Sequence, residues 1–338
     1  MSSFASRTAF EAALAVLPVP NADATAAARA RQGDLTKPPG ALGRLEEIAV
    51  FLAGWQGTAR PAIKQARAAI FAGNHGFVVY GVSAFPASVT QAMVANFASG
   101  GAAINALAGA AGLDLRVVAL ELERPTADFT IAAAMDEEDC LAALNAGAAV
   151  VEPGLDVLVV GEMGIGNTTA AAALCARSFG GAVAQWAGPG TGVDPAGIAR
   201  KIAVVEQALA FHAAAPHTPF ETLRRLGGRE IAAIAGAVLA ARLQSVPVVL
   251  DGFITCAAIA PLAACVPAIA DHCLAGHCSA EPGHTRLLDQ LGLDPLLSLG
   301  MRLGEGSGAA VAVLVIRGAL AAHNGMATFA EAGVAGAL

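Results

Sequence analysis

Short runs of aliphatic and β-branched residues alternate along this chain with longer segments whose apolar residues recur at helical spacing. Apolar runs of about four to eight residues bounded by glycine or polar turns predict buried strands, and apolar positions three and four apart predict helices. Their alternation predicts an α/β fold with a mostly parallel sheet and helices on both faces. Strands are expected at 68–72, 115–120, 157–160 and 246–250, with a further short strand at 181–186 and a short apolar run at 268–274.

Helices are expected to enclose this sheet and to occupy both ends of the chain. The terminal helices are predicted to pack together, which gives a smaller helical domain from residues 1–65 and 305–338 and an α/β domain from 66–304 that holds the site. The expected helices lie at 6–32 (a pair interrupted at Pro18 and Pro20), 41–55, 88–110 (with a break at Gly100-Gly101), 195–213, 229–243 and 309–322.

Composition and charge narrow the function classes. A chain of 338 residues that is 56% hydrophobic can bury a large core. Its formal net charge of −7 and its aromatic content of 5% argue against nucleic acid or an anionic membrane as the main partner. The apolar run 246–270 contains Asp251 and three prolines, so a membrane span is not expected. Six cysteines without a CxxC pair predict reduced thiols in a cytoplasmic protein.

The segment 157–169, VLVVGEMGIGNTT, carries the most informative pattern. A β-type run ends at Gly161, a glycine-spaced turn follows with Gly164 and Gly166, and the next residues open an alanine-rich helix at Asn167 and Thr168. A strand, a glycine turn and a helix start together bring free backbone N–H groups close to a phosphate. Glu162 within this turn would repel a phosphate, which suggests that the loop also handles a sugar or a reacting centre.

Other polar positions follow predicted strands or open helices. The loop 188–194, with Gly188 and Gly190, precedes a helix that carries Lys201. The loop is either a second anion site or a connector, and Lys201 is either a phosphate ligand or a surface charge. Asp251 ends a strand and either holds a ribose hydroxyl or caps the next helix. Its neighbours favour neither interpretation.

Three further segments contain candidate chemistry. Glu305 stands between glycines before an apolar helix, where it is either a helix-start acid or a general base whose pKa is raised by apolar surroundings. The segment 81–91, with Ser83 and Gln91, could hold a flat heteroaromatic ring. The histidines between 272 and 284 fit no common zinc spacing, so a loop that shapes a cleft or a subunit contact is favoured over a metal site.

Taken together, these segments resemble the nicotinate-nucleotide–dimethylbenzimidazole phosphoribosyltransferases, enzymes of the lower-ligand branch of cobalamin synthesis. Seven segments carry the resemblance, in order, over nearly the whole chain. They are KPPGALGRLE at 37–46, HG…GVSAFP at 75–86, GEMGIGNTT at 161–169, GPGTGVD at 188–194, VVLDGF at 248–253, SAEPGH at 279–284 and LGMRLGEGSGA at 299–309. Asn74, before the HG pair, departs from the Asp that some members carry.

The resemblance implies a Rossmann-like sheet with a smaller domain from both chain ends, a homodimer, and no cofactor or metal. It implies that 5,6-dimethylbenzimidazole attacks the ribose C1′ of nicotinate mononucleotide and that nicotinate leaves with inversion. By the same resemblance Glu305 is the general base and Glu162 and Lys201 act in catalysis. The remaining positions would bind substrate: Ser83, Gln91 and Leu303 around the base, and Gly164, Gly166, Asn167, Thr168, Gly188, Gly190 and Asp251 around the nucleotide.

Two other functions are compatible with the same residues. One is a non-catalytic nucleotide-binding or regulatory protein, because fold alone does not determine function. The other is an enzyme that hydrolyses a nucleotide or transfers a ribosyl phosphate to a different acceptor. Product analysis with and without an aromatic base separates them.

Overall fold

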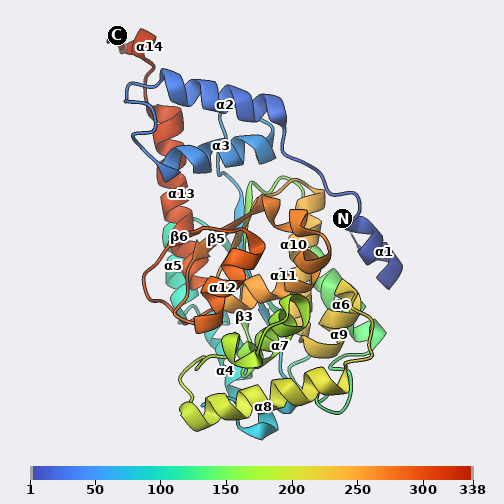
Figure 1. Ribbon diagram of the computed structural model, residues 1–338. Helices are drawn as coiled ribbons and strands as arrows, with labels where there is room; N and C mark the ends of the chain where they lie inside the picture. Colours follow the sequence, from blue (N-terminus) through green and yellow to red (C-terminus); the bar gives the residue numbers. More distant parts are fainter. Residues whose placement is uncertain (1–2, 336–338) are drawn as a thin grey trace.

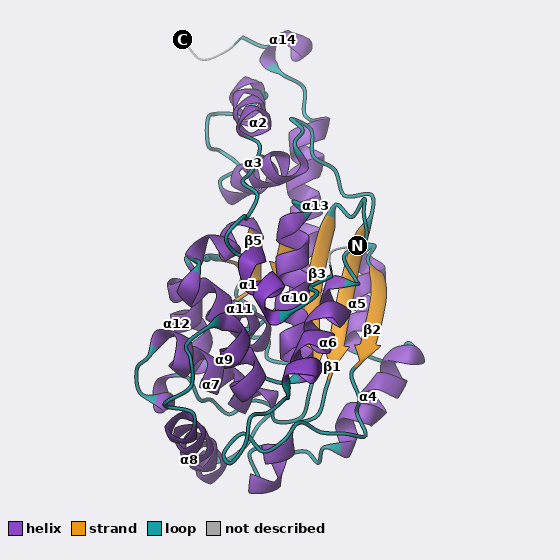
Figure 2. Cartoon of the chain, turned by 90° about the vertical axis from the view of Figure 1, so that its right-hand side faces the viewer, coloured by secondary structure: helices purple, strands orange, loops and turns teal. Residues whose placement is uncertain are grey.

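A computed structural model describes residues 3–335 and shows one all-parallel, six-stranded sheet in the order β2-β1-β3-β4-β5-β6. Figure 2 shows the central strands with helices on either side. The predicted parallel α/β class is therefore confirmed. The strands are β1 (Ala66–Ala72), β2 (Asp114–Ala119), β3 (Val157–Met163), β4 (Val248–Leu250), β5 (Cys273–His277) and β6 (Pro295–Leu297).

The central strands are buried on both faces, which explains their continuous apolar sequences. Along β1, Ala69 and Phe71 join the core on one face, and Ala68 and Ile70 join the core on the other. All seven residues of β1 are buried, because successive side chains of a strand point to opposite faces and helices cover both.

The helices divide between these two faces. α6 (Glu137–Ala148), α7 (Asn167–Phe179), α9 (Pro219–Leu226), α10 (Arg229–Leu243), α11 (Phe253–Cys265) and α12 (Pro282–Leu291) contribute to the first core. α3 (Arg44–Gln56), α4 (Ser88–Ala98), α5 (Ala103–Ala111) and α13 (Ser307–Gly325) contribute to the second. The other helical segments are α1 (Arg7–Ala13), α2 (Ala22–Asp34), α8 (Pro195–Phe211) and α14 (Phe329–Ala332), with 3-10 turns η1 (Gly76–Tyr80), η2 (Val183–Gln185) and η3 (Pro267–His272).

The long helix α13 joins the sheet to a helical group at the top of Figure 1. There it packs with α3, which in turn packs on α2. Gln32 Nε2 lies 2.8 Å from His323 Nδ1, and Arg31 donates to the His323 carbonyl. Of the described helices, α13 alone is long and apolar enough to cross a membrane, yet half of that window is buried inside the protein. α13 is thus a core helix that packs on the sheet and on α3 and α5.

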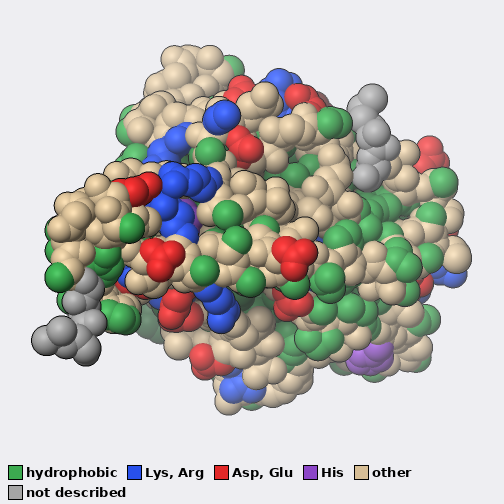
Figure 3. All heavy atoms as spheres, turned by 90° about the horizontal axis from the view of Figure 1, so that it is seen from above, with side chains coloured by type: hydrophobic (Ala, Val, Ile, Leu, Met, Phe, Trp, Pro, Cys, Tyr) green, Lys and Arg blue, Asp and Glu red, His purple; other side chains and the backbone are tan. Residues whose placement is uncertain are grey.

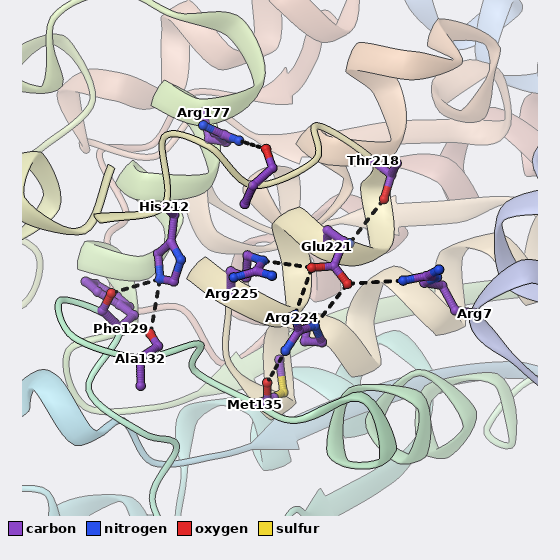
Figure 4. Close-up of polar contacts among 11 residues, drawn as sticks. Arg7, Phe129, Ala132, Met135, Arg177, His212, Thr218, Glu221, Arg224 and Arg225 are labelled. Atoms are coloured by element: carbon purple, nitrogen blue, oxygen red, sulfur yellow. Dashed lines mark hydrogen bonds and ion pairs between the residues drawn. The ribbon is translucent and has the colours of Figure 1, made fainter. Parts of the chain in front are cut away.

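The first helix of the chain packs elsewhere. Phe10 of α1 lies edge-on to Phe220 of α9, at 6.3 Å between ring centroids. Figure 4 shows the polar side of this contact, where the buried Glu221 carboxylate accepts hydrogen bonds from Arg7, Arg224 and Arg225. α1 is thus fixed to the sheet-covering helices and not to α2 and α3, and the division into two domains stays a prediction.

One predicted strand is wrong, and several elements were not predicted. Residues 181–186 contain the 3-10 turn η2, in which the indole of Trp186 donates to the Gly180 carbonyl. The helices α6, α9, α11 and α12 and the edge strand β6 had no predicted counterpart. By contrast, the predicted break at Gly100-Gly101 is confirmed, because α4 and α5 are separate helices.

The face of the molecule that carries α2 and α14 has charges of both signs (Figure 3). Seen from above, at the end where α2 and α14 lie, basic side chains are flanked by acidic ones and interspersed with apolar side chains (Figure 3). This face therefore carries no uniform basic patch of the kind that phosphate backbones attract.

Candidate active site

The candidate site lies where parallel strands end at one edge of the sheet. β2 and β3 lie on opposite sides of β1, so the chain order reverses there, and open parallel sheets bind ligands outside such a reversal. The polar residues at the strand ends meet at this edge. Glu162 is the penultimate residue of β3 and does not belong to the turn in which it was predicted to lie, because the strand continues to Met163. Asp251 follows β4, and His277 ends β5.

The turn after β3 brings the start of α7 against the site. Gly166 precedes α7 with φ at +89°, which favours glycine, and no side chain caps this helix. A Cβ on Gly164 would lie 2.9 Å from the carbonyl oxygen of Gly73, so the two backbones approach closely. The N–H groups of Asn167 and Thr169 donate to the Gly164 and Gly166 carbonyls. The helix start carries no capping side chain, the arrangement that proteins use for anions.

Glu162 is buried, and its Oε2 accepts a hydrogen bond from Asn167 Nδ2. Burial raises the pKa of Glu162 to about 8 against the lowering effect of Asn167, and the nearby Asp251, Glu230 and Glu305 raise it further. Burial therefore favours the neutral form of this carboxyl group, and a positive charge nearby would favour its ionisation.

Lys201 projects from α8 to join the two glycine loops. Its Nζ donates to Thr168 Oγ1 at 2.9 Å and to the Gly188 carbonyl at 3.0 Å. Burial lowers the pKa of Lys201 to about 8, although the negative charge of Glu281 opposes this. The ammonium is thus a buried cation at the meeting point of both loops, and the interpretation of Lys201 as a solvated surface charge is wrong.

Glu305 stands in a loop of unusual backbone geometry. Gly304, Glu305 and Gly306 have φ values of +82°, +61° and +76°. A Cβ on Gly161 would overlap the Gly306 nitrogen and lie 2.7 Å from the Glu305 carbonyl carbon, so the loop rests directly on the β3 backbone. Glu305 Oε2 is buried without a hydrogen-bond partner, and burial raises the pKa of its carboxyl group.

Asp251 acts as a helix cap, although not for the helix that follows it. Its carboxylate accepts from the Ala309 nitrogen at 2.8 Å and from the Gly306 nitrogen at 3.2 Å, at the start of α13. Burial raises its pKa to about 7 despite these bonds. His277 Nε2 lies 3.6 Å from the same carboxylate. Asp251 therefore fixes the loop that carries Glu305.

Most of the predicted residues line two adjoining cavities. The larger cavity is lined by Glu162, Gly164, Asn167, Thr168, Gly190, Asp251, Glu281, Arg302, Leu303 and Gly304, among others. The smaller cavity is lined by Ser83, Gly164, Gly166, Asn167, Thr168 and Lys201, among others. Gly164, Ile165, Asn167, Thr168 and Thr191 line both, so the two cavities are parts of one site.

Gln91 is placed differently. It lines neither cavity, and its Nε2 donates to Glu123 Oε1 at an exposed position. Ser83 is closer to the predicted role, because it lines the smaller cavity while its Oγ accepts from the Phe85 nitrogen. A role for Gln91 at the base stays a prediction.

Several site residues were not assigned from sequence. His75 Nε2 lies 2.7 Å from Glu230 Oε1, and both side chains are fully buried beneath the glycine turn. Arg302 Nη1 donates to the Gly190 carbonyl. His75, Glu281 and Arg302 lie in the segments HG, SAEPGH and LGMRLGEG, which carry the family resemblance, but the sequence pattern gave these three residues no function. Glu230, in the otherwise apolar α10, had no such signal.

The histidine-rich segment is built into the core. His272 lies within hydrogen-bond distance of the Ile269 and Val238 carbonyls, and His284 Nδ1 lies 2.9 Å from Ser279 Oγ. Within residues 3–335 no group of three or more His, Cys, Asp and Glu side chains is arranged to hold a metal ion. These histidines therefore support the wall of the larger cavity, to which His277 and Ser279 belong.

Comparison with known proteins identifies the family. A family described as phosphoribosyltransferase matches residues 17–334. The nicotinate-nucleotide–dimethylbenzimidazole phosphoribosyltransferase of Novosphingobium aromaticivorans is 81% identical over 338 residues, which covers 100% of both chains. This chain belongs to the nicotinate-nucleotide–dimethylbenzimidazole phosphoribosyltransferase family. The member from Ruegeria sp. (strain TM1040) is 60% identical over 325 residues, or 96% of each chain.

Solved structures of the family agree. CobT from Thermus thermophilus superposes with a TM-score of 0.87 at 41% identity and covers 93% of this chain and 100% of its own. A second structure is that of the nicotinate-nucleotide–dimethylbenzimidazole phosphoribosyltransferase from the same organism. It gives a TM-score of 0.85 at 40% identity and covers 94% of this chain and 100% of its own. The resemblance inferred from the seven segments, and the enzyme class that it implies, are confirmed. The chain is a phosphoribosyltransferase.

Proposed function

We propose that this chain transfers the 5-phosphoribosyl group of nicotinate mononucleotide to 5,6-dimethylbenzimidazole, in the synthesis of the lower ligand of cobalamin. The products are α-ribazole 5′-phosphate and nicotinate. The observation that carries this proposal is the buried, unpartnered Oε2 of Glu305. Glu305 lines neither cavity itself but directly follows Gly304, which lines the larger one beside the two glycine loops. Family membership supports the choice of substrates.

The reaction requires a proton acceptor and no proton donor. A benzimidazole nitrogen forms a bond to C1′ as the bond from C1′ to the pyridinium nitrogen breaks, with inversion at C1′. The bonding pair neutralises the pyridinium, so nicotinate leaves without receiving a proton. The attacking ring becomes cationic unless its second nitrogen loses its proton, and Glu305 accepts that proton. The raised pKa of its carboxyl group makes it a stronger base than an exposed glutamate.

The other groups fit the charges of the nucleotide. The uncapped start of α7 and the Lys201 ammonium would bind the 5′-phosphate through N–H donors and positive charge. Glu162 would face the ribose, where it can ionise as positive charge develops at C1′. Ser83 and Leu303 would border the benzimidazole, since each lines one of the two adjoining cavities.

We also propose a cytoplasmic homodimer, as the family resemblance implies. All six cysteines are free in the structure, in keeping with a reducing compartment. Light scattering on the purified protein tests the dimer, for which the expected mass is twice that of the chain. A mass equal to one chain at working concentrations contradicts it.

The experiment for the main proposal follows nicotinate release from nicotinate mononucleotide with and without 5,6-dimethylbenzimidazole. We expect release that depends on the base, with α-ribazole phosphate formed in equal amount. Release without the base would identify a hydrolase. Nucleotide binding without release would identify a binding or regulatory protein. The Glu305→Gln variant serves as the matched control, because it should bind both substrates and turn them over slowly.

A further inference from the structure

Glu281 is a glutamate in the wall of the larger cavity. Its position in the fold is that of a helix cap, but its carboxylate does not cap the helix. It is the N-cap residue of α12, where a carboxylate usually accepts from the backbone of the first turn, yet its side chain makes no capping bond. The residue is 7% exposed, and both carboxylate oxygens are buried without a hydrogen-bond partner. Two strong acceptors therefore lie unused within the wall of this cavity.

The surrounding structure holds this carboxylate in place. The Glu281 nitrogen donates to Ser279 Oγ, and the Ser279 nitrogen donates to His284 Nδ1 at 2.9 Å. Pro282 follows at the start of α12 and restricts the backbone. A Cβ on Gly188 would overlap Glu281 Oε2, so the second glycine loop leaves room for the carboxylate at this point. The side chain is therefore directed at the loop that also binds Lys201.

Nearby cations compensate the charge of Glu281 without using its oxygens. Burial raises the pKa of its carboxyl group, and the positive charges of Lys201 and Arg302 lower it, as does the Gly190 backbone. Among the ion pairs of residues 3–335, none includes Glu281. Lys201 instead donates to Thr168 and Gly188. The carboxylate thus lies beside the proposed phosphate position, where the Gly190 N–H is a nearby backbone donor but neither oxygen has a partner at hydrogen-bond geometry.

The chemistry of nicotinate mononucleotide limits what can donate a hydrogen bond to these oxygens. Its phosphate and its nicotinate carboxylate accept hydrogen bonds at neutral pH, and its ribose hydroxyls donate them. The ribose follows directly after the phosphate that Lys201 and the glycine loops would bind. We propose that Glu281 accepts hydrogen bonds from the ribose 2′- and 3′-hydroxyls and makes the site specific for a ribosyl over a deoxyribosyl donor. This inference rests on the proposed function for the identity of the nucleotide.

The test measures kcat/KM at saturating base for nicotinate mononucleotide and for its 2′-deoxy and 3′-deoxy analogues. Hydrogen bonds to a charged group are worth about 10- to 100-fold, so the wild-type enzyme should prefer the ribonucleotide over at least one analogue by that factor. Glu281→Ala should lose a similar factor on the ribonucleotide and little on that analogue, so that the preference falls to near one. Glu206→Ala, an exposed glutamate on α8, is the control and should keep the wild-type preference.

The outcomes separate this inference from the function on which it rests. If the wild-type enzyme transfers phosphoribose and Glu281→Ala lowers kcat/KM equally for all three nucleotides, Glu281 acts through Lys201 and the hydroxyl assignment is wrong. If the wild-type enzyme shows no base-dependent turnover, the proposed function fails, and the same comparison made by calorimetric binding still decides the role of Glu281. Glu281→Gln keeps the shape and one acceptor, so it should retain part of the preference if the alanine variant does not fold.

Discussion

Glu305 allows a test in which stability and activity should change in opposite directions. Its backbone is in the left-handed region at φ +61°, which costs a non-glycine residue about 1–2 kcal/mol. Its buried Oε2 has no partner, which costs about 1–3 kcal/mol. Glu305→Gly removes both costs but adds about 0.5–1 kcal/mol of chain entropy in the unfolded state. We therefore expect a net gain of about 1–4.5 kcal/mol in the free energy of unfolding.

This gain is measurable against a matched control. With an unfolding entropy of about 2.1 cal/mol/K per residue, a chain of 338 residues should rise in Tm by about 1.5–6 °C. Ser245→Gly is the control, because Ser245 has the same left-handed backbone conformation, at φ +56° between α10 and β4. The substitution relieves the same backbone strain but removes no carboxylate from the site. It should change stability by less than about 1 kcal/mol and leave turnover unchanged.

The activity measurement completes the test. Nicotinate release in the presence of dimethylbenzimidazole should fall by about 10²–10⁴-fold in Glu305→Gly and in Glu305→Gln, because both lack the base. A Glu305→Gly protein that is less stable than wild type would show that the carboxylate serves the fold. Turnover within about tenfold of wild type in the folded Gln variant would refute its role as the base.

Three other changes probe other parts of the structure. Lys201→Ala should raise the KM for nicotinate mononucleotide more than the KM for the base, and equal effects on both substrates would reject the phosphate role of Lys201. In the wild-type enzyme the KM for the nucleotide should rise above about pH 8, the pKa of Lys201, because the ammonium then loses its charge. Burial tends to raise the pKa of Glu221, but its arginine partners lower it from 4.5 to about 2. The ionised Glu221 therefore stabilises the folded protein fully above pH 4.5, and this contribution disappears as the pH falls towards 2. Glu221→Gln should therefore lower the free energy of unfolding in urea by about 2–3 kcal/mol at pH 7 and much less at pH 2.5, and an equal loss at both would contradict the ion-pair account. Gly161→Ala should displace the Glu305 loop and lower kcat while the base still binds, and unchanged kcat would show that the loop adapts.

Much of the fold was predictable because it depends on short-range pattern. The strand predicted at 157–160 was found from its continuous apolar run, although β3 extends beyond Gly161 to Met163, and the helix over 229–243 was found from the helical spacing of its apolar residues. The helices α9 and α12 were missed because they are short and rich in charged residues, and the strand predicted at 181–186 is a turn held by the Trp186 indole. At 181–186 this side-chain hydrogen bond, six residues along the chain, stabilises a turn where the apolar run alone favoured a strand.

By itself, the sequence determined which loops have the backbone freedom of the candidate site, because glycines and helix starts at 161–169, 188–194 and 304–306 act locally on the backbone. Only the tertiary structure decided what those loops meet. The strand order places the start of α13 on β3, so Asp251 caps a helix distant in sequence and Gly161 supports Glu305. It also buries Glu281 and Lys201 around one loop. Such pairings depend on strand order and packing in three dimensions, which no local spacing of residues encodes.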